Sequence, residues 1–213
     1  MKIENCVAVV SGGASGLGAA VVKELTENGA KAAILDFDLE NGEKLALELG
    51  DKVIFCKTDV TDAASVKSAI DRTMEAFGAI HFAVNCAGVA SPKKVIDKKG
   101  NPMPADFFNR VIQINLVGTM NVLSLAAVEM CKNTPTEDGE KGAVINVAPV
   151  AAFEAARWVR LPMRVQSRRR RHGPANCPGI CRLRHPGQHH CAGHFYDPDD
   201  GRASGKCSAN SRR

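Results

Sequence analysis

Short apolar runs alternate with longer amphipathic stretches from the start of the chain through residue 146. The apolar runs lie at residues 6–10, 31–36, 52–57, 80–85 and 143–147. The amphipathic stretches, each of helical length, lie at residues 16–28, 39–49, 63–77 and 105–132. Short uninterrupted apolar runs are typical of strands that are buried on both faces of a parallel sheet. Strands that alternate with helices through right-handed crossovers predict an α/β fold with a doubly wound parallel sheet.

The periodic pattern ends after Phe153, and the charge balance changes at the same place. Residues 1–154 hold 15 Lys and Arg against 20 Asp and Glu, a net charge of −5, whereas residues 155–213 hold 13 against 3, a net charge of +10. The later stretch shows neither helical nor strand spacing and resembles disordered sequence in composition. We therefore predict one domain over residues 1–154 and a basic, non-periodic tail over residues 155–213.

A glycine-rich turn connects the first predicted strand to the first predicted helix, with the sequence Ser-Gly-Gly-Ala-Ser-Gly-Leu-Gly at residues 11–18. Gly12 permits the tight turn, while Gly16 and Gly18 let the backbone approach a pyrophosphate and let the helix approach the sheet. Phosphates then bind the N–H groups at the helix N-terminus. A strand before the turn and a helix after it are the context that a Rossmann-type dinucleotide site requires.

Asp36 ends the second predicted strand, 18 residues beyond Gly18. A carboxylate at this place accepts hydrogen bonds from the ribose hydroxyls of NAD and repels the 2′-phosphate of NADP. The sequence therefore predicts NAD as the cofactor. The alternative interpretation is that Asp36 is an ordinary turn residue after a strand.

Three further motifs make the first 154 residues resemble the short-chain dehydrogenase/reductase family. They are Asp59-Val60 after the third predicted strand, Asn85-Cys86-Ala87-Gly88 after the fourth, and Asn115 within Ile-Asn-Leu-Val-Gly-Thr on the long predicted helix. The amino-acid sequences at residues 84–90 and 150–154, together with the Lys-rich loop at 91–104, are most similar to the type-2 3-hydroxyacyl-CoA dehydrogenase branch of the family.

The resemblance implies a role for each motif. Ser15, Leu17, Asp36, Asp59, Val60 and Cys86 are expected to contact NAD, and the Asn85–Gly88 turn, with Ala87, to support the cofactor and the sheet. Asn115 is expected to kink the long helix and to help hold a water in a proton relay. The implied reaction is reversible oxidation of a secondary alcohol, such as a 3-hydroxyacyl-CoA or another hydroxy substrate, to a ketone. Residues 89–109 are expected to flank that substrate, and a homotetramer is expected where the C-terminal part is normal.

The catalytic groups that the family places after this region are missing from the sequence. The family uses a Ser, a Tyr thirteen residues later and a Lys four residues beyond the Tyr, and these positions hold Pro149, Pro162 and Gln166. Proline offers neither a hydroxyl nor an N–H group, and Tyr196, the only Tyr, is followed four residues later by Asp200. By this interpretation the chain as written binds NAD at most, and Asn115 is the one member of the catalytic set present.

A shifted reading frame accounts for these absences. Codons for residues 156–163 can also be read, from their third nucleotide, as Gln-Val-Gly-Gln-Ala-Ala-Tyr, with the Tyr thirteen positions after Pro149. Similar shifts give Ser-Lys over residues 165–167 and Asn-Thr-Ile-Ala-Pro-Gly over residues 188–193, with one further slipped nucleotide between the Tyr and the Lys. We interpret residues 155–213 as a frameshifted reading of a dehydrogenase C-terminus.

Other interpretations remain open for the tail as written. The chain is then a catalytically inactive NAD-binding protein or interaction module. The residues at 168–171, all Arg, could contact nucleic-acid phosphates, although no aromatic residues accompany them. Cys177, Cys181 and Cys191, with His185, His189 and His190, could bind zinc, but their spacing fits no common ligand pattern. We expect neither a metal nor a nucleic-acid partner.

The remaining cysteines and the lengths of the apolar runs indicate where in the cell the protein is located. Cys6, Cys56, Cys86 and Cys131 are scattered singly, which favours reduced thiols over a disulfide framework. No apolar run approaches the roughly 20 residues that span a bilayer, and no leader precedes the first predicted strand. We therefore expect a cytoplasmic protein without a membrane partner.

Overall fold

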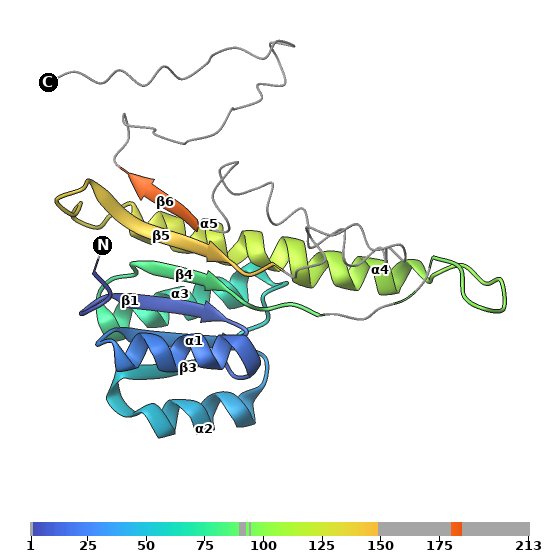
Figure 1. Cartoon of the computed structure of the whole chain (residues 1–213), viewed down its shortest axis with the longest axis horizontal. Coiled ribbons are helices and arrows are strands. Elements are labelled where there is room, and N and C mark those ends of the chain that lie inside the picture. Colours follow the sequence, from blue (N-terminus) through green and yellow to red (C-terminus); the bar gives the residue numbers. More distant parts are fainter. Residues whose placement is uncertain (1, 90–92, 94, 149–179, 185–213) are drawn as a thin grey trace, which may run out of the picture.

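The computed structural model describes residues 2–89, 93, 95–148 and 180–184 (Figure 1). The strands are β1 (Val7–Ser11), β2 (Lys31–Asp36), β3 (Val53–Lys57), β4 (Phe82–Asn85), β5 (Glu140–Asn146) and β6 (Ile180–Arg184). The helices are α1 (Gly16–Glu27), α2 (Leu39–Leu49), α3 (Ala63–Phe77), α4 (Ala105–Ile112) and α5 (Gly118–Met130). A 3-10 turn, η1 (Gly50–Lys52), precedes β3, and a π-helical turn, η2 (Gln113–Val117), joins α4 to α5.

The strands form one sheet in the order β3-β2-β1-β4-β5-β6. The first five in this order run parallel, and β6 pairs antiparallel with β5. The chain moves outward from β1 to β3 and then crosses back to place β4 on the other side of β1. This reversal is the switch point at which doubly wound sheets bind their ligands. The predicted fold class, a doubly wound Rossmann-type sheet, is confirmed.

Successive strand residues serve two separate cores, one on each face of the sheet. On one face, Val9 and Leu35 pack with residues of α3 and α5, including Ile70 and Val122. On the other face, the next residues along the same strands, such as Val10, pack with residues of α1 and α2. Because side chains alternate across a strand, both faces can be buried only if nearly every strand position is apolar. This burial on both faces explains why the strands appear in the sequence as uninterrupted apolar runs.

Short polar side chains and one glycine set the ends of the helices. The Asp38 carboxylate accepts a hydrogen bond from Asn41 N–H at the start of α2, and Asp62 does the same for Ala64 N–H at the start of α3. At the end of α3, Gly78 takes a left-handed conformation with a φ of +78°, which costs glycine little. These boundaries coincide with those predicted for α2 and α3.

The structure differs from the predicted elements at a few places. The long helix at 105–132 is divided by η2, and the fifth strand begins three residues before its predicted start. The tail was predicted to have no strand spacing, whereas its strand β6 pairs along β5 from Glu140 to Ile145. Unpaired ladder groups on an edge strand favour such an addition. The division into domains at residue 154 stays a prediction.

One helical segment is long and apolar enough to span a membrane, although no apolar run of that length was predicted from the sequence. Residues Ala105–Met130 reach a mean hydropathy of 1.7 over 18 residues, although Asn, Gln, Thr and Ser interrupt the apolar run. Length and composition alone are weak support for a membrane span, because a core helix meets the same test. Buried side chains such as Val111, Val122, Ala126 and Met130 account for part of this apolar character, since 33% of the 18-residue window is buried inside the protein.

Candidate functional site

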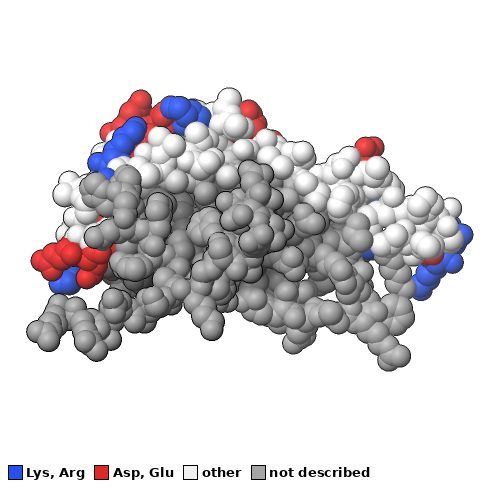
Figure 2. All heavy atoms as spheres, turned by 90° about the horizontal axis from the view of Figure 1, so that it is seen from above, with Lys and Arg blue, Asp and Glu red and all other residues white. Residues whose placement is uncertain are grey.

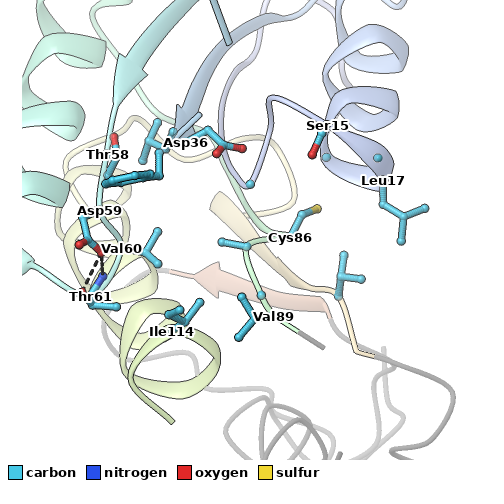
Figure 3. A pocket seen from close by; sticks show the side chains of 18 of the residues that line it. Ser15, Leu17, Asp36, Thr58, Asp59, Val60, Thr61, Cys86, Val89 and Ile114 are labelled. Atoms are coloured by element: carbon cyan, nitrogen blue, oxygen red, sulfur yellow. Dashed lines mark hydrogen bonds between the residues drawn. The ribbon is translucent and has the colours of Figure 1, made fainter. Parts of the chain in front are cut away.

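A cavity of about 760 Å³ opens at the carboxyl ends of the strands, at the switch point of the sheet (Figure 3). Its walls come from the glycine-rich turn, the ends of β2, β3 and β4, and one face of α4 and η2. The predicted cofactor residues in the lining are Gly12, Ser15, Gly16, Leu17, Gly18, Asp36, Asp59, Val60, Cys86, Ala87 and Gly88. Asn85 and Asn115 lie behind the wall. The structure thus brings together motifs from four separate parts of the sequence.

The glycine-rich turn is shaped by close backbone approaches. Gly12 has a φ of +68°, and a Cβ there would lie 2.7 Å from the Ala87 Cα. A Cβ on Gly18 would collide with the Gly12 carbonyl oxygen. Gly16 differs, because a Cβ on it would meet nothing within 4 Å although its φ is +53°. The turn therefore leaves open space beside the first N–H groups of α1, which have no acceptor within the helix.

Asp36 connects the end of β2 to the glycine-rich turn. Its carboxylate accepts hydrogen bonds from the N–H of Ala14 at 2.9 Å and from the N–H of Asp38 at 3.0 Å. A carboxylate has about four acceptor positions, so two remain for a ligand. In Figure 3 the side chain lies at the upper wall of the cavity. Asp36 is thus both a turn residue and a cavity residue, and its contact with NAD stays a prediction.

The end of β3 forms the adjoining wall around Asp59 and Val60. The Asp59 carboxylate accepts hydrogen bonds from the N–H and the hydroxyl of Thr61, at 2.9 and 2.7 Å. The Val60 side chain is almost fully buried and lies close to Gly118, where an added Cβ would be 2.6 Å from a Val60 methyl group. Asn121 of α5 donates to the Val60 carbonyl oxygen at 2.9 Å. This wall is therefore fixed to the long helix.

Asn85 holds three strand ends together from behind the cavity. Its side chain is fully buried, accepts a hydrogen bond from the Ser11 hydroxyl at 3.2 Å and donates to Asn146 at 2.9 Å. The Ser11 hydroxyl in turn accepts the N–H of Ala87 at 3.4 Å. These bonds join the ends of β1, β4 and β5. Asn85 therefore positions the Asn85–Gly88 turn without lining the cavity itself.

Asn115 lies inside the π-helical turn and is fully buried. Its side chain accepts the N–H of Val89 at 2.8 Å and donates to the Val89 carbonyl oxygen at 2.9 Å. Thr119 donates its hydroxyl to the Asn115 carbonyl oxygen at 2.9 Å. Single π-helical turns occur frequently at functional sites. Here the turn joins the long helix to the segment that leaves β4, and the predicted water-holding role stays a prediction.

Several cavity residues were not found from the sequence. Phe37 and Thr58 directly follow strands β2 and β3, so the rule that ligands bind at carboxyl ends of parallel strands could have indicated them. The others are Leu35, Thr61, Arg110, Gln113, Ile114 and Val147, whereas Val89 begins the segment 89–109 that was predicted to flank the substrate. Arg110, Gln113 and Ile114 share one face of the long helix, and the sequence does not show which face of an apolar helix meets the cavity.

The positions that would decide the chemistry lie outside the described residues. These are Pro149, Pro162 and Gln166, together with Tyr196, the Arg residues at 168–171 and the side chains proposed as zinc ligands. Within residues 2–89, 93 and 95–148, no three His, Cys, Asp or Glu side chains come together as a metal site.

Comparison with known proteins gives concordant matches. The family model described as short chain dehydrogenase matches residues 6–160. Human 3-hydroxyacyl-CoA dehydrogenase type-2 is 43% identical over 154 residues, covering 72% of this chain and 59% of the human protein. An uncharacterized oxidoreductase of Thermotoga maritima is 37% identical over 156 residues, covering 72% of this chain and 57% of that protein. The crystal structure of 3-hydroxyacyl-CoA dehydrogenase type-2 from Mycobacterium avium superposes with a TM-score of 0.72 at 32% identity, covering 78% of this chain and 66% of that one. This chain spans about three fifths of the length of the curated relatives it matches.

Proposed function

The chain belongs to the short-chain dehydrogenase family, and on that premise we propose that it is an NAD-dependent oxidoreductase. The proposed reaction is the reversible oxidation of a secondary alcohol to a ketone, on a 3-hydroxyacyl-CoA or a similar hydroxy substrate. The relatives named as type-2 3-hydroxyacyl-CoA dehydrogenases support this substrate class. The observation that carries the proposal is the cavity with the glycine-rich turn on one wall and Asp36 beside it.

The described residues fit a nicotinamide dinucleotide. The open space beside Gly16 admits a pyrophosphate at the N-terminus of α1. The remaining acceptor positions of Asp36 suit the two ribose hydroxyls of NAD, and its negative charge opposes a 2′-phosphate. Asp59 and Val60 would hold the adenine end, and the Asn85–Gly88 turn would support the other half. When bound, the nicotinamide ring supplies the hydride acceptor or donor for the reaction.

A second candidate is an NAD-binding protein without turnover. When hydride leaves the alcohol carbon, the alcohol oxygen must lose its proton, and the reverse reaction returns both. A positioned acid or base is required for that proton, which the family takes from a Tyr whose pKa is lowered by a Lys. The sequence has Pro162 and Gln166 at these positions and Pro149 at the Ser position. None of these three side chains can take or give a proton near neutral pH. Asn115 alone cannot replace them.

Peptide mapping of the purified protein across residues 150–170, with an intact mass, separates the two candidates. A peptide containing Gln-Val-Gly-Gln-Ala-Ala-Tyr supports the dehydrogenase with a normal C-terminus. A peptide with Trp158, the only Trp, contradicts the oxidoreductase proposal and favours cofactor binding without catalysis. Isothermal titration with NAD then tests binding directly, and the near-ultraviolet absorbance of reduced nicotinamide tests turnover with 3-hydroxybutyryl-CoA.

Assembly and location form part of the same proposal. We propose a homotetramer built in part through the long helix, on which Met120 and Val128 of α5 expose more than half of their surface. We also propose a cytoplasmic location, which the single, scattered cysteines of residues 1–148 support because they favour a reducing compartment. Light scattering of the purified protein tests the assembly, since a monomer at all concentrations would contradict it.

A further inference from the structure

Arg110 is the only Lys, Arg or His among the described residues that line the cavity. The two acidic lining residues, Asp36 and Asp59, already accept hydrogen bonds from neighbouring backbone and hydroxyl groups. Arg110 forms no ion pair with any residue that the structure describes, not even with Asp106 one turn earlier on α4. Its guanidinium is exposed on the cavity wall and is available to an anionic ligand group.

The position of Arg110 separates it from the predicted dinucleotide contacts. Ile114, one turn further along the same helix face, lies on the opposite side of the cavity from Asp36 in Figure 3. The space for the pyrophosphate is beside Gly16, on the α1 wall, where backbone N–H groups supply the donors. A cation on the α4 wall therefore indicates an additional anionic group, one that does not belong to the dinucleotide.

A second cation extends the same helix face outward. Phe107 precedes Arg110 by three residues, so the two side chains are neighbours on α4. The Lys93 ammonium lies 4.5 Å from the centre of the Phe107 ring, which anchors the lysine to this face. Lys98 and Lys99 follow in the projecting loop before α4, where basic side chains gather at one end of the molecule (Figure 2). Positive charge thus continues from the cavity toward the loop.

We propose that Arg110, assisted by Lys93, binds a phosphate group of the proposed acyl-CoA substrate. This inference rests on the proposed function and assigns residues of the same site to the part of the substrate that carries its phosphates. A hydroxy substrate without a charged group would gain nothing from a cation here. A guanidinium forms two parallel hydrogen bonds with a phosphate, and the Lys93 ammonium nearby adds a second positive charge. Arg110 is therefore a specificity-determining residue for the part of the substrate remote from the reacting carbon.

Binding measurements test the proposal without any need for turnover. Isothermal titration of the full chain uses coenzyme A, phosphate-free pantetheine and NAD as separate probes. A charge-assisted hydrogen bond contributes about 1.5–3 kcal/mol, so Arg110→Gln is expected to raise the Kd for coenzyme A by about tenfold or more. Arg110→Lys should recover part of the loss, and Lys93→Gln should show a smaller effect. The Kd values for NAD and pantetheine should stay within about twofold of the wild type.

Lys67→Gln is the matched control, since Lys67 pairs with Asp71 on α3 and does not line the cavity. An unchanged Kd for coenzyme A in Arg110→Gln would overturn the inference, as would a wild-type protein that binds pantetheine as tightly as coenzyme A. A parallel loss of NAD affinity would assign Arg110 to the dinucleotide and overturn it equally. A wild-type protein that binds coenzyme A but not NAD would instead contradict the proposed function. Because Arg110 is exposed, circular dichroism of the variant should match that of the wild type.

Discussion

At the scale of single residues, the location of Asp36 in the cavity could be predicted because Asp36 lies at the end of a strand. A carboxylate directly after a buried parallel strand must lie at the edge where all the carboxyl ends meet, whatever the rest of the fold does. Arg110 was not predictable in the same way. Its neighbours on the long helix are apolar on several sides, and only the packing of α5 against the sheet decides which face meets the cavity.

Replacement of Asp36 tests the cofactor choice. Asp36→Asn keeps the shape of the side chain and removes the charge that opposes a 2′-phosphate. We expect the Kd for NAD to rise by about tenfold, because hydrogen bonds to charged groups contribute about 1.5–3 kcal/mol, and the preference for NAD over NADP to shrink. Isothermal titration with both dinucleotides measures this. Asp38→Asn is the control, because Asp38 caps α2 and does not line the cavity. Unchanged selectivity in Asp36→Asn would contradict the assignment.

His81 makes the stability of the domain depend on pH. Its Nδ1 accepts the N–H of Val7 at 3.0 Å, and burial lowers the pKa of His81 from the ordinary value of 6.5. The folded state therefore binds its proton less readily than the unfolded state. The contribution to stability is fully present above pH 6.5 and is lost as the pH falls from there toward the folded pKa.

Urea unfolding between about pH 5 and 8 measures this dependence. We expect the free energy of unfolding to decrease below the ordinary pKa of histidine in the wild type. His81→Asn retains an acceptor for Val7 but does not titrate in this range, so its profile should be flatter. Profiles of equal slope in the two proteins would show that His81 is not the responsible group.

At the scale of elements, the strands follow closely from the sequence and the long helix does not. A strand that is buried on both faces must be apolar throughout, so β2 was predicted with its observed bounds. The turn η2 adds one residue to a helical turn without changing its apolar character, and the pattern at residues 113–117 does not reveal it. The strand β6 owes its place to the edge of β5 and not to its own periodicity.

Asn115 is expected to hold the π-helical turn against the segment after β4. Asn115→Ala removes the acceptor for the Val89 N–H and the donor to its carbonyl oxygen, and we expect it to cost about 2 kcal/mol of stability. Hydrogen exchange at Val89 should accelerate along with the loss measured by urea unfolding. Asn109→Ala is the control, because Asn109 is exposed on α4 and forms no hydrogen bond with a described side chain. Unchanged protection of Val89 in Asn115→Ala would mean that η2 is held by other contacts.

At the scale of the whole molecule, the cavity depends on distant parts of the chain being ordered together. The glycine-rich turn, the ends of β2 to β4 and the α4 face are joined by the hydrogen bonds of Asp36, Asn85 and Asn115. A ligand that bridges these walls binds only the folded state. Its binding must therefore stabilise the fold as a unit. The sequence predicted the motifs, but their common cavity arises only when the sheet forms.

Thermal unfolding with NAD measures this coupling. A ligand at 100 times its Kd stabilises the folded state by about 2.7 kcal/mol, and a chain of this size gains about 2–4 °C in Tm per kcal/mol, so we expect a rise of about 5–10 °C. NADP at the same concentration should raise the Tm less, because Asp36 opposes its 2′-phosphate, and Asp36→Asn should bring the two shifts together. Since the shift needs no catalysis, it is expected whichever form the C-terminal residues take. A Tm unmoved by NAD at millimolar concentration would contradict dinucleotide binding by this cavity, and the proposed oxidoreductase function with it.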